Sequence, residues 1–94
     1  MSYKKRWDTS AYNSGFGRWL DNLMRACDMN NGEVASALHI SQYTVRYHRS
    51  GSRSPTFPDV VAYCWLFVKK GVPHVGSPET VWKVVKADKK AKSE

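Results

Sequence analysis

Residues 33–55 have the sequence EVASALHISQYTVRYHRSGSRSP, and the order of apolar and helix-capping residues in this stretch decides the fold. A short helix is predicted at its start. Asn30 or Asn31 supplies the N-cap, and Glu33 places an acid in the first turn, where the helix dipole favours it. This helix is predicted to end near His39.

A second short helix is predicted after a three-residue turn. Ser41 is a good N-cap for the segment QYTVRYHRS, and Gly51 stands where helices commonly end in a left-handed residue. Val45 and His48 lie three residues apart and are predicted to face the interior. Two short helices joined by such a turn form a helix-turn-helix unit.

The unit makes steric demands that these residues meet. Ala35 is the small residue needed where the two helices cross closely. Leu38 and Ile40 flank the turn as aliphatic residues. His39 occupies the turn position, and histidine is among the residues that visit positive φ. Val34 completes the buried face of the first helix.

The N-terminal part is predicted to be irregular and basic over residues 1–16, because Gly15 and Gly17 argue against a firm helix before residue 17. Further on, a helix is predicted over about residues 18–29, before the breaking sequence Asn-Asn-Gly. Its apolar stripe consists of Trp19, Leu20, Leu23, Met24 and Cys27.

Two more elements are predicted after the loop that contains Pro55. A helix over residues 58–70 carries the apolar run VVAYCWLFV, which must be buried on more than one side. The sequence Ser-Pro-Glu at 77–79 is a strong helix start. The following TVWKVVK also suits a strand, although a helix is favoured. The lysine-rich end from Lys86 is predicted to fray.

The fold is therefore predicted to be all-α, a small bundle of about five helices that contains the helix-turn-helix. The 94 residues are divided into a basic arm (1–16), a helix-turn-helix domain (17–71) and a C-terminal helix or strand with a lysine-rich tail (72–94).

The charge of the chain points to a polyanionic partner. Fifteen Lys and Arg against eight Asp and Glu give a net charge of +7. No acid lies between Glu33 and Asp59, whereas Arg46, Arg49 and Arg53 all fall in this gap. A basic small domain is expected to bind nucleic acid first and an acidic membrane surface second.

Other classes of function find little support in the residues. Cys27 and Cys64 lie in apolar segments without Cys-x-x-Cys spacing, which predicts reduced thiols in a cytoplasmic protein and no metal site. The start MSYKKRWD lacks the apolar run of a signal peptide, and no apolar run is long enough to span a bilayer. No cofactor, small-molecule ligand or membrane partner is indicated.

An enzyme is not expected either. The sequence shows no nucleophile–base pair or phosphate-binding loop. His39 and His48 lie nine residues apart with no acid nearby to support general-base chemistry. No catalytic residue is therefore predicted.

At EVASALHISQYTVRYHRSGSRSPTFPDVV the chain resembles the lambda-repressor-like helix-turn-helix proteins, which include phage repressors and Cro proteins. The resemblance covers about residues 18–70. His39 stands at the family's turn glycine, and His48 and Arg49 stand at its apolar–glutamate pair, so the family glutamate is absent. The matching positions are Val34, Ala35, Leu38, Ile40, Ser41, Gln42, Val45, Gly51, Arg53 and Pro55.

The resemblance implies that the helix at 41–50 enters the major groove of DNA. Its outward positions, which are predicted to contact bases, are Gln42, Tyr43, Arg46 and Tyr47. Gln42 suits adenine, Arg46 suits guanine, and the tyrosines suit thymine methyl groups or phosphates. Phosphate contacts are predicted for Asn31, Ser41, Thr44, Arg49, Ser50 and Arg53.

The expected function is a sequence-specific regulator of transcription that binds double-stranded DNA. The resemblance implies a phage or mobile-element repressor of the Cro type that binds a palindromic operator as a homodimer. The predicted dimer interface consists of Trp65, Phe67, Val81, Trp82 and Val85. The alternative is a DNA-binding adaptor for excision, partition or packaging, or an antitoxin whose apolar helix at 58–70 binds a protein.

Overall fold

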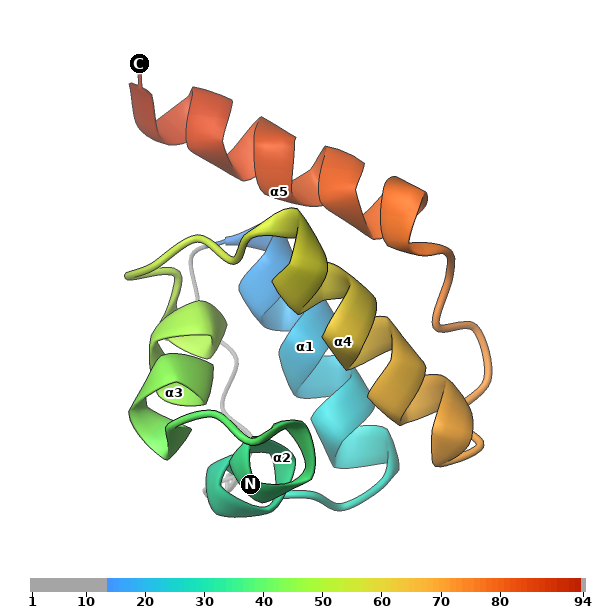
Figure 1. Cartoon of the computed structure of the whole chain (residues 1–94). Coiled ribbons are helices and arrows are strands. Elements are labelled where there is room, and N and C mark those ends of the chain that lie inside the picture. The colour runs from blue at the N-terminus through green and yellow to red at the C-terminus, as the bar shows by residue number, and fades with distance from the viewer. Residues whose placement is uncertain (1–13, 94) are drawn as a thin grey trace, which may run out of the picture.

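The computed structural model describes residues 14–93, which form five helices and no strand (Figure 1). The predicted all-α bundle is therefore confirmed. The predictions for the first 13 residues of the basic arm lie outside the described residues. The helices are α1 (Gly15–Ala26), α2 (Asn31–Leu38), α3 (Gln42–Ser50), α4 (Phe57–Lys69) and α5 (Pro78–Ser93).

The core lies between α1 and α4, which run side by side through the middle of the molecule, with α5 across one end (Figure 1). The α2–α3 pair packs on the other side. Each fully buried large apolar side chain contributes about 1.5–3 kcal/mol to folding. The most completely buried apolar residues are Phe16, Leu20, Met24, Val34, Val45, Val60, Tyr63, Leu66, Phe67 and Val85.

Helix α1 begins earlier than predicted, because the two glycines mark close packing rather than a break. The Ser14 hydroxyl caps the helix by accepting from the Gly17 amide at 2.9 Å. A Cβ on Gly17 would lie 2.2 Å from the carbonyl oxygen of Arg49 in α3. Glycine at this position therefore allows α1 and α3 to approach more closely than any side chain would permit.

The start of α1 is also held by α5. The Asp88 carboxylate accepts from the amides of Gly15 at 2.9 Å and Phe16 at 3.0 Å. These amides have no partner inside the helix, and the positive end of the helix dipole attracts an acid. The prediction of irregular chain up to residue 16 was thus wrong for the residues from Gly15 onward.

Helix α5 is a helix and not a strand, as favoured from the Ser-Pro-Glu start. Ser77 accepts from the Thr80 amide at 3.2 Å. The β-branched residues Val81 and Val85 form a buried stripe one turn apart. Helix α5 continues to Ser93, past Lys86, the residue from which fraying was predicted.

Helix α4 starts within one residue of the prediction. Thr56 and Asp59 form a capping box, with the Asp59 amide donating to Thr56 at 3.3 Å and the Thr56 amide donating to Asp59 at 2.9 Å.

Cys27 and Cys64 are both free thiols, as predicted. Burial raises the pKa of each thiol, so both are protonated at neutral pH. No helix between residues 14 and 93 is long and apolar enough to cross a membrane.

Candidate nucleic-acid interface

The α2–α3 pair is built by local capping as predicted. Asn30 and Glu33 form a capping box, each side chain accepting from the other residue's amide at 2.8 Å. Ser41 caps α3 by accepting from the Tyr43 amide at 3.1 Å. His39 ends α2 in the left-handed region at φ 57°, which confirms its predicted turn conformation.

The inward face of α3 is fixed by two buried residues. Val45 is fully buried, and only 2% of His48 is exposed. His48 Nδ1 lies 2.7 Å from the Tyr63 hydroxyl oxygen of α4, and Phe16 of α1 meets the imidazole edge-on. Burial lowers the pKa of His48 and outweighs Asp59, whose carboxylate lies 4.0 Å from Nε2 and raises the pKa. His48 is therefore neutral at pH 7.

The outward face of α3 brings together the four residues predicted to contact bases: Gln42, Tyr43, Arg46 and Tyr47. All four are exposed, with 56% of Tyr43 and 40% of Tyr47 open to solvent. The Arg53 guanidinium lies 5.4 Å from the centre of the Tyr47 ring in a cation–π contact. The sequence places no carboxylate on α3, so this face is uncharged or positive.

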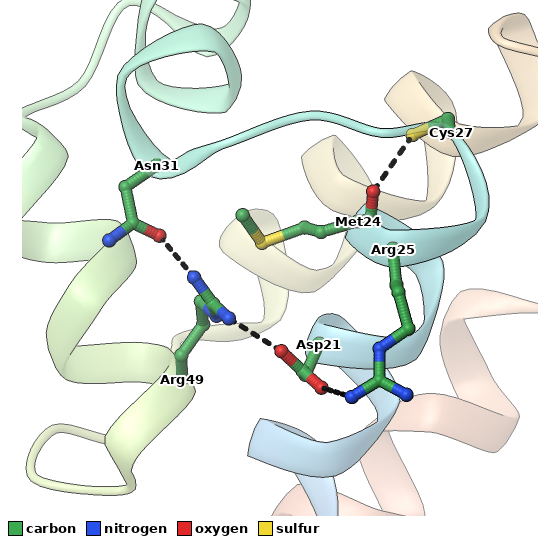
Figure 2. A network of polar contacts seen from close by, with 6 residues as sticks. All are labelled: Asp21, Met24, Arg25, Cys27, Asn31 and Arg49. Atoms are coloured by element: carbon green, nitrogen blue, oxygen red, sulfur yellow. Dashed lines mark hydrogen bonds and ion pairs between the residues drawn. The ribbon is translucent and has the colours of Figure 1, made fainter. Parts of the chain in front are cut away.

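A buried ion pair joins α3 to α1, as Figure 2 shows. The Arg49 guanidinium donates to the Asp21 carboxylate at 2.5 Å and to Asn31 Oδ1 at 2.8 Å. Asp21 is fully buried, and its second oxygen accepts from Arg25 at 3.2 Å. Arg49 thus links α1, α2 and α3, and it stands where the lambda-repressor-like pattern has glutamate.

Sequence reasoning missed Asp21, although a signal was present. Gly17, Leu20, Asp21 and Met24 are spaced i, i+3, i+4 and i+7, and all four are buried. An acid within such a stripe needs a buried cationic partner, because an isolated buried charge is costly. The sequence alone did not identify Arg49 as that partner, since 28 residues separate the two.

The residues predicted to contact phosphate differ in their exposure to solvent and in their hydrogen bonds. Asn31, Arg46, Arg49 and Ser50 line an open hollow of about 230 Å³ between α2 and α3. The Arg49 side chain is only 11% exposed and bonds inward, whereas Ser41 and Arg53 are exposed. Thr44 and Ser50 are half-buried, and Ser50 Oγ lies 2.9 Å from Ser52 Oγ.

The five residues predicted to form a dimer interface are mostly inside the single chain. Phe67, Val81 and Val85 are at most 3% exposed and belong to the core between α4 and α5. Trp82 is half-buried and packs edge-on against Phe57, with ring centres 5.6 Å apart. The periodicity of the sequence indicates which residues are buried. It does not indicate whether another helix of the same chain or a second copy of the chain covers them.

Trp65 is the exception. It is 53% exposed, with the Lys69 ammonium 4.7 Å from the centre of its ring. Val61, Trp65 and Val68 are spaced along one exposed side of α4, next to Pro78. This surface remains free in the single chain.

Comparisons with protein-family models, curated proteins and solved structures find no match to this chain. Within the described part of the chain, no three His, Cys, Asp or Glu residues are grouped so that they could hold a metal ion. The site is therefore characterised by its own geometry, an exposed polar and aromatic helix face on a tightly packed all-α scaffold.

Proposed function

We propose that α2, the turn and α3 form a helix-turn-helix unit of the lambda-repressor-like kind that binds double-stranded DNA in a sequence-specific way. The observation that supports this most strongly is the division of α3 into two faces. Val45 and His48 hold one face in the core. The other face is exposed and presents side chains that can form hydrogen bonds with base edges.

The proposed contacts follow from the chemistry of the four exposed residues. Gln42, at the start of α3, can pair bidentately with adenine, and Arg46, one turn later, can pair bidentately with guanine. Tyr43 and Tyr47 offer ring surface to thymine methyl groups and hydroxyls to phosphates. An α-helix fits the width of the major groove of B-DNA, so these side chains can reach successive base pairs.

Asn31 suits a phosphate contact because of the way in which Arg49 orients it. The Arg49 guanidinium donates to Asn31 Oδ1, so the amide Nδ2 is directed away from that bond (Figure 2). The Nδ2 group is then a donor positioned at the start of α2, where free backbone amides also favour an anion. We assign Arg49 a positioning role and assign phosphate contacts to Ser41, Thr44, Ser50 and Arg53.

The biological role that fits these contacts best is that of a small phage or mobile-element regulator, a repressor of the Cro type. We propose that it binds a palindromic operator as a homodimer. Trp65 is the predicted interface residue that the fold leaves available. The same exposed side of α4 favours the second candidate, a DNA-binding adaptor or antitoxin, because Val61, Trp65 and Val68 could equally contact a different protein.

Selection of bound sequences from a random duplex library at a stated salt concentration tests the proposal. Enrichment of one palindromic motif supports the regulator. Recovery of all sequences alike overturns sequence-specific binding. Sedimentation of the complex with the enriched duplex separates two protein copies from one, and a single copy argues against the homodimer.

Substitution of Arg46 sharpens the test. Arg46→Ala should lose about 1–3 kcal/mol at one base position and relax the preference there. Lys70→Gln removes the same charge at the C-cap of α4, whose C-terminal end lies away from α3 (Figure 1). This control should keep the base preference of the natural chain, and an equal loss of preference in both variants would contradict the assignment of Arg46.

A further inference from the structure

The loop that follows α3, residues 51–55, is tied to a single residue of the helix, Tyr47. The Tyr47 carbonyl oxygen accepts from the backbone amides of Gly51 at 3.0 Å and Arg53 at 3.3 Å. It also accepts from the Ser50 hydroxyl at 3.2 Å. The backbone of Arg53 is therefore held beside Tyr47 independently of any contact between the two side chains.

The side chains of Tyr47 and Arg53 are also in contact. The Arg53 guanidinium carbon lies 5.4 Å from the centre of the Tyr47 ring, within the range of a cation–π interaction. Both side chains are exposed to solvent. The other side of α3 is held in the core by Val45 and His48, so the Tyr47 ring provides a fixed surface for the longer arginine side chain.

The positive charge of Arg53 is available to an external anion. Within residues 14–93, no carboxylate forms an ion pair with Arg53. Asp88 lines the same small cavity as Arg53, but the Asp88 carboxylate accepts from the first amides of α1. A cation–π contact uses the face of the ring and leaves the guanidinium N–H groups able to donate. Arg53 can therefore bind an anion while it stays against the ring.

We propose that Tyr47 and Arg53 form one phosphate-binding site at the C-terminal end of α3, in which the Tyr47 ring positions the Arg53 guanidinium. This inference rests on the proposed function, since the phosphate belongs to the duplex that α3 contacts. A guanidinium suits a phosphate because two of its N–H groups can donate in parallel to two phosphate oxygens. Tyr47 then has a positioning role, and base recognition depends on the other three exposed residues of α3.

The place of the pair on α3 favours a phosphate over a base. In helix-turn-helix proteins the N-terminal residues of the second helix contact the base edges. Tyr47 lies in the second half of α3, and Arg53 lies beyond its end. The guanidinium also occupies one side of the Tyr47 ring that a thymine methyl group would need. Contacts to phosphate fix the register of a protein on the duplex, so the pair adds affinity without changing the base preference.

The test is a double-mutant cycle on the affinity for the enriched duplex. Tyr47→Leu removes the ring but no charge, and Arg53→Ala removes the guanidinium. A cation–π contact at an exposed site corresponds to roughly two- to fivefold in affinity, so Tyr47→Leu should weaken binding of the natural chain by about this factor. In the Arg53→Ala background the same substitution should leave the affinity nearly unchanged.

Further readouts distinguish positioning from a general loss of binding. Tyr47→Phe keeps the ring and should bind like the natural chain. Arg53→Ala should lower the slope of log K against log[salt] by about 0.9, the contribution of one phosphate. Both Tyr47→Leu and Arg53→Ala should keep the base preference in the library selection. Tyr43→Leu, one turn earlier on α3, is the matched control, and its effect on affinity should be the same with and without Arg53. A shared melting temperature shows that the variants are folded.

The outcomes separate this inference from the proposed function. If Tyr47→Leu weakens binding equally with and without Arg53, or if Tyr47→Phe binds as weakly as Tyr47→Leu, the positioning role is overturned and the α3 interface stands. A changed preference at one base pair in Tyr47→Leu also overturns it, because Tyr47 would then contact a base. An unchanged slope in Arg53→Ala overturns the phosphate contact. If the natural chain binds no duplex at any salt concentration, both proposals fail.

Discussion

Replacing Arg49 with methionine should destabilise the protein strongly, because it leaves the Asp21 carboxylate in the core without its main partner. Asp21 is fully buried, and Arg49 is only 11% exposed. Removing one member of a buried ion pair typically costs about 3–5 kcal/mol. Arg25 still bonds to the second Asp21 oxygen at 3.2 Å, so we expect the lower end, about 3 kcal/mol.

The measurement is urea unfolding followed by helical circular dichroism, which gives the free energy of unfolding. In a domain of this size each kcal/mol lowers the melting temperature by about 4–8 °C, so Arg49→Met should melt about 12–24 °C lower. Arg25→Met is the matched control. Its side chain is 38% exposed, so water can partly replace it at the buried Asp21 oxygen, and its loss should cost about 1–2 kcal/mol, less than the loss of Arg49.

A second substitution tests whether the loss of stability comes from the stranded Asp21 charge. Adding Asp21→Asn to Arg49→Met removes the stranded charge while keeping the shape of the side chain. The double variant should therefore be more stable than Arg49→Met alone. A double variant that is less stable than Arg49→Met, or an Arg49→Met cost below about 1 kcal/mol, would refute the idea that the buried pair anchors α3.

Three other perturbations have expected outcomes. Burial lowers the pKa of His48 in the folded state, so the free energy of unfolding should be highest above pH 6.5, the pKa of the unfolded residue, and should decrease as the pH falls below it. Urea titrations from pH 7.5 to 5.5 measure this decrease. In His48→Gln the free energy of unfolding should change less over the same pH range. Gly17→Ala should cost more than about 2 kcal/mol through its clash with the Arg49 carbonyl, whereas Gly32→Ala, which meets nothing closer than 3.5 Å, should be neutral or stabilising in thermal melts. Asp88→Ala should lose about 1–2 kcal/mol and speed amide exchange in the first turn of α1; unchanged exchange would argue against the cap.

The α2–α3 pair could be predicted almost residue by residue because its boundaries depend on neighbouring residues in the sequence. Asn30 and Ser41 cap the helices through bonds to residues two or three positions away. His39 and Gly51 end them in left-handed conformations at φ 57° and 86°. The exposed face of α3 follows from the same periodicity that buries Val45.

The features that the sequence did not predict depend on contacts between segments that are distant in the chain. The start of α1 depends on Asp88, more than seventy residues away, and on the close approach of the Arg49 backbone to Gly17. The Asp21–Arg49 pair likewise depends on how α1 and α3 pack. Phe67 was recognised as apolar, but the sequence did not show that α5 covers the bundle and leaves no room there for a second copy.

The Asp88 cap also has a consequence for how the chain matures on the ribosome. The bonds from Gly15 and Phe16 to Asp88 span 73 and 72 residues. Closing a loop of that length costs about 4 kcal/mol in chain entropy beyond the constant term. The helices up to α4 can associate earlier, but the first amides of α1 stay uncapped until residue 88 has been made and α5 has packed. A product truncated before residue 88 would therefore have a frayed start of α1 and should be cleaved there by a protease more readily than the natural chain.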